Sequence, residues 1–394
     1  MEFALINERT LVQAEKLWDY CFEKQDTFFF QWYFKNYCLK QNEILGAFTS
    51  NKELVSMVHL NPYNIYLHGE AMRTVYLVGV ATDPLMRGRG VLKDLMLMTF
   101  MLLRAQGHHF VLLMPEYAGI YQPYQFSFVY FKRKYEMPLA ELQFQAPDRD
   151  VLLSEFKNES KNNLALLNSI YEKHMVNYSA YVMRNVNMWQ DFLTVFRAEG
   201  GKVIVAHKNK EIVGYFLYRI QDKTFYIHEL LCQTYQAKST LLHFVKQHLG
   251  QCDHLSWLAA FDDRTYCELA NHHLSGGSTP FMMARLIDAR KALTKIQVPK
   301  SLSGSFILLI ADELMKDNNY LLEITVKNGN MLLKEVFELP DIEIDIDALT
   351  QLYFGSTKAS DLIFEGKINI INKDAGAIFA QLWSCQINYI NEYY

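Results

Sequence analysis

The hydrophobic pattern of this 394-residue chain predicts three blocks, 1–145, 146–295 and 296–394. The first block opens with two segments of helical periodicity, 10–23 and 27–40. Strand-like runs follow at 43–49, 54–67 and 73–82, then a helix over 90–106, a strand over 109–114 and more strand around 129–137. This order of helices and strands predicts an α/β fold with a mixed sheet.

The second block repeats part of this order. Strand-like runs at 203–207, 212–219 and 224–231 precede a helix over 236–248, a strand over 254–259 and another over 280–287. Three strands, a helix and a strand therefore occur in the same order in both blocks, which predicts an internal duplication.

The third block has a different pattern, and the boundary before it is expected within 295–304. A strand over 305–311 is followed by a hairpin at Asn328-Gly329-Asn330 and by an alternating run at 342–346. Helices are expected from about 347 and around 375–383.

Composition and charge exclude several classes of protein. Half of the residues are hydrophobic and 21% are charged, as in a globular protein with sizeable cores. The net charge of −4 argues against a nucleic-acid partner. The longest apolar run, 95–103, is far shorter than the ~18 residues of a membrane span, so no membrane association is expected. The six cysteines are scattered and no HExxH occurs, so we expect no metal site and a cytoplasmic location.

The strongest chemical signal is the segment 78–92 (VGVATDPLMRGRGVL), where an apolar strand ends at Asp83-Pro84 and Arg-Gly-Arg-Gly opens a long helix. Glycines let consecutive N–H groups point into one concavity, and the helix N-terminus and two arginines add positive charge. These features suit a pyrophosphate. The alternative is an ordinary strand–turn–helix with solvated arginines.

This segment resembles the acyl-CoA pyrophosphate loop of the GNAT acetyltransferases, whose pattern is Arg/Gln-x-x-Gly-x-Gly/Ala. Leu92 departs from the usual small residue, a departure shared by the Eis-like branch of that superfamily. The chain also resembles that branch in its length, in its second GNAT-like block and in a last block similar to the sterol carrier protein fold. The resemblance covers nearly the whole chain and implies two tandem GNAT-like domains followed by a sterol carrier protein-like α/β domain.

The resemblance implies one acetyl-CoA site, in the first block. The pantetheine arm is expected along the strand residues Val80, Ala81 and Thr82. The pyrophosphate is expected on Arg87, Gly88, Arg89, Gly90, Val91 and Leu92. The corresponding segment of the second block, 229–238 (ELLCQTYQAK), contains no glycine or arginine, so its backbone cannot approach a pyrophosphate in the same way.

Two catalytic residues follow from the resemblance. Tyr121, within the segment 119–126 (GIYQPYQF), occupies the position of the general acid, although Gln125 replaces the usual glycine after it. The C-terminal carboxylate, here that of Tyr394, acts as the base in Eis-like proteins. The bulky tail 387–394 is costly to leave in water, so we expect it to be packed. The alternatives are that Tyr121 is one of 24 tyrosines with no special role, and that the tail packs a subunit interface.

The acceptor is the least specified part. Aromatic residues around 27–34 border the acceptor pocket in the resembled family, and with a few carboxylates they would attract a cationic amine. The candidates are Asp26, Trp32, Tyr33, Glu116 and Glu392. Each aromatic residue could equally belong to an ordinary core helix.

The predicted function is acetyl transfer from acetyl-CoA to a primary amine (aminoglycoside, polyamine or lysine side chain) by direct attack in a ternary complex. The resemblance also implies a homo-oligomer, with a hexamer as the expected form. One alternative is a lipid- or acyl-CoA-binding or scaffold protein, with an apolar cavity near Phe306, Leu309, Phe354 and Trp383. A second alternative, a structural protein with a degenerate GNAT core, is disfavoured because the first block keeps its arginine–glycine loop.

Overall fold

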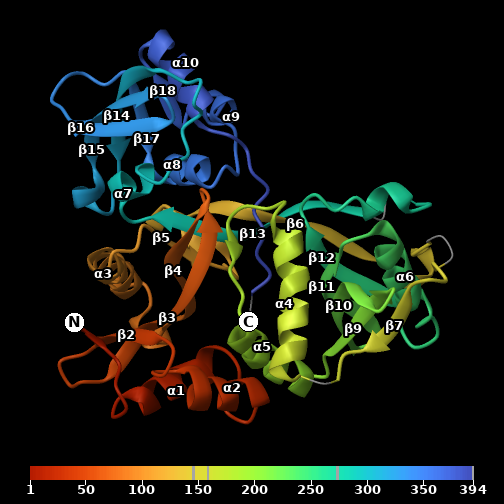
Figure 1. The fold of residues 1–394 in the computed structure, drawn as a ribbon. Coiled ribbons are helices and arrows are strands. Elements are labelled where there is room, and N and C mark those ends of the chain that lie inside the picture. The colour runs from red at the N-terminus through yellow and green to blue at the C-terminus, as the bar shows by residue number, and fades with distance from the viewer. Residues whose placement is uncertain (144–146, 158, 272–274, 393–394) are drawn as a thin grey trace. The chain divides into compact units, whose positions relative to one another are not determined.

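The structure, a computed structural model, describes the chain except for residues 144–146, 158, 272–274 and 393–394 (Figure 1). The chain divides into two compact units. The first unit is Met1–Tyr130 together with Phe281–Asn388, and the second is Phe131–Pro280 together with Tyr389–Tyr394. The boundaries of the three sequence blocks, at 145 and 295, remain a prediction.

The first block supplies β1 to β5 of a mixed sheet, and β13 from the second block adds next to β5, in the order β1-β2-β3-β4-β5-β13. Neighbouring strands are antiparallel except for the parallel pair β4 and β5. The strands are β1 (Glu2–Leu5), β2 (Glu43–Phe48), β3 (Leu54–Leu67), β4 (Glu70–Thr82), β5 (Phe110–Leu113) and β13 (Ser275–Leu286), which pairs with β5 through Met283 to Leu286.

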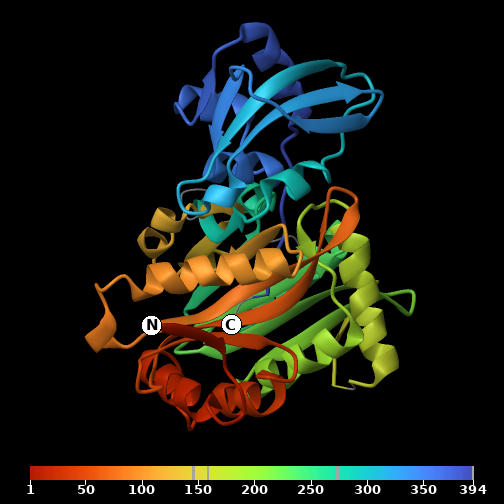
Figure 2. The ribbon, with the colours of Figure 1, turned by 90° about the vertical axis from the view of Figure 1, so that its left-hand side faces the viewer.

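Helices cover both faces of this sheet (Figure 2). On one face α3 (Val91–Ala105) packs its apolar stripe, with Leu95 and Phe100, on Val58 of β3. Because side chains alternate along a strand, the neighbouring His59 points to the other face. There it meets Trp18 of α1 (Leu11–Cys21), next to α2 (Phe28–Trp32) and the π-helical turn Tyr33–Tyr37 that continues it.

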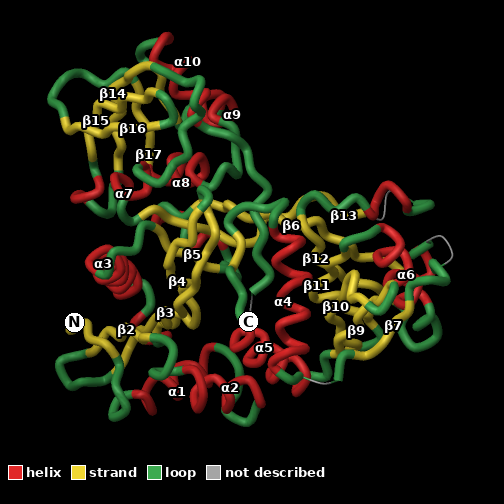
Figure 3. The backbone as a smooth tube through the Cα atoms, in the orientation of Figure 1, coloured by secondary structure: helices red, strands yellow, loops and turns green. Residues whose placement is uncertain are grey.

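The third block has its own sheet, in the order β16-β15-β14-β17-β18 (Figure 3). Asn328 and Gly329 both have positive φ, at 54° and 81°, and close the predicted hairpin between β15 and β16. The strands are β14 (Gly304–Ala311), β15 (Tyr320–Lys327), β16 (Asn330–Glu335), β17 (Ile342–Asp345) and β18 (Ile368–Ile370). Its helices are α8 (Ile346–Tyr353), α9 (Ala359–Phe364) and α10 (Lys373–Leu382), and α7 (Ala289–Leu293) directly precedes the block.

A fully buried ion pair joins this block to the first sheet within the same unit. Arg285 on β13 donates from Nη2 to both carboxylate oxygens of Asp312, at 2.9 Å each. Asp312 also accepts from the backbone N–H of Met315 and from the Asn318 amide. Burial lowers the pKa of Arg285, and the Asp312 charge opposes that shift. The pair therefore depends on both partners being present.

The second unit repeats the arrangement of the first sheet, in the order β6-β12-β11-β10-β9-β7. Its antiparallel neighbours β9, β10 and β11 are followed by a helix and by β12, which is parallel to β11. The strands are β6 (Ser127–Pro138), β7 (Leu152–Glu155), β9 (Lys202–Lys208), β10 (Glu211–Gln221), β11 (Thr224–Cys232) and β12 (His254–Ala260). A short strand, β8 (Tyr181–Val182), precedes α5. The predicted duplication is confirmed.

Helices again cover both faces. On one face α6 (Tyr235–Lys246) packs on Phe216 and the core around it, and on the other α4 (Lys161–Met175) and α5 (Val186–Ala198) pack on Tyr215 and Leu217. The hydrophobic pattern predicts α6 but neither α4 nor α5.

Two general features complete the fold. No helix in the described part of the chain combines the length and apolar character needed to cross a membrane. Among the described residues, no group of three or more His, Cys, Asp or Glu side chains is arranged to hold a metal ion.

Replacing Asp312 by Asn should destabilise the first unit by about 3–5 kcal/mol, because it leaves a buried guanidinium without its anion. Urea unfolding followed by tryptophan fluorescence measures this loss. The control Glu335→Gln breaks the exposed ion pair with Arg290 and should cost less than about 1 kcal/mol. Equal losses for the two variants would contradict the role assigned to the buried pair.

Candidate active site

A β-bulge interrupts β4 where the sequence predicts the substrate strand. The register with β3 passes from His59 opposite Val78 to Met57 opposite Ala81, so Gly79 and Val80 together face one residue of β3. Gly79 has φ +57°, and a Cβ there would lie 2.3 Å from the Trp18 ring. Only glycine fits this position.

The strand β4 extends past the end of its parallel neighbour β5. Their pairing covers Val75 to Leu77 on β4 and Val111 to Leu113 on β5, where β5 ends, whereas β4 itself continues to Thr82. Val80, Ala81 and Thr82 thus lie on the part of β4 that does not pair with β5, and their role in binding the pantetheine arm stays a prediction. Backbone groups on such a strand end can pair with an extended ligand arm.

The loop after β4 leaves the N-terminus of α3 open. Pro84–Met86 forms a 3-10 turn, and the exposed Arg87 donates from Nε to the carbonyl oxygen of Thr82 at 3.1 Å. Gly88 and Gly90 have φ of +72° and +81°, and Gly90 caps α3 without a side-chain hydrogen bond. The first N–H groups of a 15-residue helix, next to exposed Arg87 and Arg89, suit a pyrophosphate.

In the second unit, the N-terminus of the corresponding helix is capped by a side chain instead. The Thr234 hydroxyl caps α6 by accepting from the N–H of Ala237 at 3.2 Å. A bulge is nevertheless present in β11, because the register with β10 skips His228 between Ile227 and Glu229. The second unit therefore keeps the bulge and lacks the open loop.

Tyr121 lies between two 3-10 turns, Ala118–Ile120 and Gln122–Tyr124. The centre of its ring lies 6.0 Å from the centre of the Phe126 ring, and the side chain packs against the hydrophobic core that includes Val91 of α3. Burial, with a smaller contribution from Tyr124, raises the pKa of Tyr121 to about 12, so the phenol stays protonated near neutral pH. Gln125 takes the left-handed conformation at φ +60° that glycine usually supplies, so this turn forms without the glycine.

The predicted acceptor residues differ in burial and in the unit to which they belong. Tyr33 is fully buried and Trp32 is half-buried, whereas Asp26 and Glu116 are exposed. Glu392 belongs to the second unit, where it forms an ion pair with Arg184. The proposed roles of these five residues stay predictions.

Tyr33 belongs to a buried polar network on the α1 and α2 face of the sheet. Asn42 Oδ1 accepts from the Leu39 N–H, and Asn42 Nδ2 donates to the Tyr33 hydroxyl and to Asn61 Oδ1. The Tyr33 hydroxyl lies 3.1 Å from Asn61 Oδ1, to which it can donate, and 3.1 Å from His59 Nδ1, with which it shares a hydrogen bond.

The other ring nitrogen of His59, Nε2, is buried and has no hydrogen-bond partner in the described part of the chain. Burial lowers the pKa of His59 to about 3, so the ring is neutral. A Cβ at Gly79 would lie 3.2 Å from its Cδ2, which places the ring against the bulge. The sequence analysis missed His59 and Asn61, although two polar residues two positions apart on an apolar strand are a readable signal.

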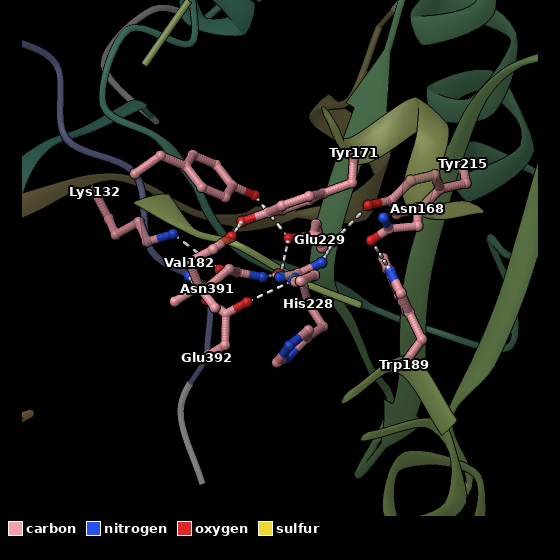
Figure 4. Close-up of polar contacts among 12 residues, drawn as sticks. Lys132, Asn168, Tyr171, Val182, Trp189, Tyr215, His228, Glu229, Asn391 and Glu392 are labelled. Atoms are coloured by element: carbon pink, nitrogen blue, oxygen red, sulfur yellow. Dashed lines mark hydrogen bonds and ion pairs between the residues drawn. The ribbon is translucent and has the colours of Figure 1, made fainter. Parts of the chain in front are cut away.

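The described part of the tail is packed, as predicted. Tyr389, Ile390 and Asn391 are each less than 5% exposed. Glu392 accepts from Arg184, which donates from Nη1 and Nη2 to the two oxygens of Glu229 at 2.7 and 2.8 Å (Figure 4). Burial opposes ionisation of Glu229, but the charge and hydrogen bonds of Arg184 prevail and lower its pKa to about 2. Tyr394 lies outside the described residues.

Comparison with protein families gives three matches along the chain. The acetyltransferase (GNAT) domain matches residues 2–129, and a second acetyltransferase (GNAT) domain matches residues 180–286. The sterol carrier protein domain matches residues 289–391. Comparison with curated proteins gives no match.

Solved structures of similar fold match the chain over its whole length. A probable N-acyltransferase from Enterococcus faecalis has a TM-score of 0.88 at 20% identity, covering 100% of this chain and 99% of that one. A GCN5-related N-acetyltransferase from Anabaena variabilis has a TM-score of 0.82 at 16% identity, and Eis1 from Mycobacterium abscessus has 0.75 at 18%, each covering 100% of both chains. At these identities the likeness shows the fold. The two acetyltransferase (GNAT) domain matches together cover more than half of the chain. This chain therefore belongs to the GNAT acetyltransferases, with two GNAT domains followed by a sterol carrier protein domain.

Proposed function

We propose that this enzyme transfers the acetyl group of acetyl-CoA to a primary amine, such as that of an aminoglycoside, a polyamine or a lysine side chain. The proposed reaction is direct attack in a ternary complex, at one site per chain, in the first GNAT domain. The observation that carries the proposal is the uncapped N-terminus of α3 directly after the part of β4 that extends past β5. The capped N-terminus of α6 supports the restriction to one site.

In this mechanism Arg87 and the loop up to Leu92 hold the pyrophosphate, and the end of β4 holds the pantetheine arm. A backbone N–H beside the bulge polarises the thioester carbonyl. The amine nitrogen forms a bond to the carbonyl carbon as the carbon–sulfur bond breaks, so the products are an amide and CoA. The leaving thiolate takes a proton from Tyr121, and the attacking amine gives one to the Tyr394 carboxylate.

Nothing in the described residues favours the lipid-binding alternative over acetyl transfer. Phe306 packs edge-on against Phe379, and Phe379 against Trp383, with centroids 5.8 and 5.7 Å apart. Phe354 packs in the same way against Phe110. These aromatic residues fill space with one another. The homo-oligomer remains a prediction from the family resemblance, and the cytoplasmic location remains a prediction from the scattered cysteines.

Gly90→Ala should weaken acetyl-CoA binding roughly tenfold or more, because alanine disfavours the left-handed conformation that opens the α3 N-terminus. Calorimetric titration with acetyl-CoA measures the effect. Gly107→Ala is the matched control, since Gly107 also has positive φ and open space around its Cβ but lies after the other end of α3. Wild-type affinity in Gly90→Ala would remove the loop from the proposed site.

Tyr121→Phe should lower kcat by ~10²-fold at unchanged KM for acetyl-CoA, because it removes the proton donor and keeps the ring. Tyr124→Phe, in the next turn, is the control and should stay near the wild-type rate. Because the pKa of Tyr121 is raised to about 12, its phenol stays protonated between pH 7 and 10. Any decrease of activity across this pH range therefore comes from another group and should be the same in Tyr121→Phe. A kcat of Tyr121→Phe within threefold of the wild type, roughly, would exclude Tyr121 as the acid.

Deleting Tyr394 should also lower kcat by ~10²-fold, because it moves the terminal carboxylate back by one residue. Tyr394→Phe keeps the carboxylate where it is and should retain activity. Thiol release during turnover measures both variants. If Tyr394→Phe loses as much activity as the deletion, the phenol ring matters and the carboxylate is not the base.

A further inference from the structure

The second GNAT domain has the same strand geometry at which the first domain is proposed to react. Its parallel pair β11 and β12 ends at Ile227 and Trp257, and β11 then continues to Cys232. The bulge residue His228 follows directly after the last pair. His228 corresponds to Gly79 of the first domain. There a single residue separates the bulge from Leu77, the last residue of β4 that pairs with β5.

The two faces of the second sheet can be matched to those of the first. In the first domain α3 follows β4 and packs on one face, while α1 and α2 cover the other. In the second domain α6 follows β11, so the face covered by α4 and α5 corresponds to that of α1 and α2. In the proposed reaction the cofactor loop belongs to the α3 side, which leaves the α1 and α2 side for the acceptor.

The residues 389–392 pack on the α4 and α5 face of the second domain. Tyr389 is a member of the core cluster formed by these helices, and its N–H donates to the Ser179 carbonyl at 3.0 Å. Its hydroxyl donates to Glu229 Oε1 at 2.8 Å. The Asn391 amide donates to the carbonyl oxygen of His228, the bulge residue, at 2.9 Å. The segment is therefore bound directly at the bulge.

Charge complementarity fixes this segment further. Lys132 donates to Asn391 Oδ1 at 2.9 Å and lies 4.8 Å from the centre of the Tyr389 ring. Arg184 links Glu229 to Glu392 (Figure 4). The guanidinium carbon of Arg184 lies 4.1 Å from the centre of the Tyr171 ring, so the cation also makes a cation–π contact with that ring. Two buried basic side chains thus hold the segment, Arg184 through the Glu392 carboxylate and Lys132 through the Asn391 amide oxygen.

We propose that the α4 and α5 face of the second GNAT domain is a peptide-binding site whose ligand is this chain's own segment 389–392. Its specificity elements are Glu229 for the Tyr389 hydroxyl, the His228 carbonyl and Lys132 for the Asn391 amide, and Arg184 for the Glu392 carboxylate. The second domain then binds a peptide where the first binds an amine. A positioning role for these groups rests on the proposed function: by holding 389–392 they would position the Tyr394 carboxylate.

The test uses the full-length chain with Glu392→Gln, which keeps the side-chain shape and removes the charge that faces Arg184. We expect hydrogen–deuterium exchange of the peptide that contains 389–392 to accelerate at least tenfold, with exchange in α4, α5 and α6 unchanged. Exchange at the wild-type rate would overturn the proposal. Glu211→Gln, at an exposed carboxylate of the same unit, is the matched control and should leave exchange unchanged.

Asn391→Leu is the second variant, because it removes the hydrogen bonds to His228 and Lys132 without removing a charge. It should accelerate exchange of the same peptide, and unchanged exchange would again overturn the proposal. In both variants we expect kcat to fall at least tenfold with KM for acetyl-CoA unchanged, a split that general destabilisation would not give. Faster exchange with wild-type kcat would support the proposed peptide site and would exclude the terminal carboxylate as the base.

Discussion

The constraint on which the rest of the structure depends is the bulge in β4, just past the end of its parallel neighbour β5. The pairing of β4 with β5 ends at Leu77 and Leu113, where β5 itself ends, so the rest of β4 has no partner on that side from β5. The bulge at Gly79 follows two positions later and increases the local twist of β4. The glycine has to be there, because the Trp18 ring fills the space where a side chain would start.

The two GNAT domains show how one frame supports two kinds of binding. Both keep the bulge, but they differ at the helix that follows. A glycine cap leaves the first turn of α3 open to an anion, whereas the Thr234 hydroxyl satisfies the first turn of α6 internally. On the opposite face, the first domain buries the neutral network of Tyr33 and His59, and the second buries the ion pair of Arg184 and Glu229. Loss of the cofactor loop thus accompanies a change in what the other face holds.

Periodicity predicted most of the elements. The strand 54–67, the helix after Gly90 and the Asn328-Gly329 hairpin lie where the pattern places them. The pattern did not predict helix α4, because asparagines at 162, 163 and 168 lower the helix propensity of this segment. Local patterns also could not show that Tyr33 is buried, or that Arg184 lies between Glu229 and Glu392, since those contacts join segments far apart in sequence.

The bound segment also has a consequence for the order of folding. Lys132, Arg184, His228 and Glu229 are all synthesised well before the segment, and the hydroxyl of Tyr389 reaches Glu229 across 160 residues. Arg184 and Glu229 form their ion pair with each other and do not need the segment for it. Because domains generally fold in the order of their synthesis, we expect the second domain to fold first. The insertion of 389–392 is then a late, long-range step that waits for the synthesis of the third block. We expect a nascent chain to pass through a state in which its second domain is folded and its peptide-binding face is vacant.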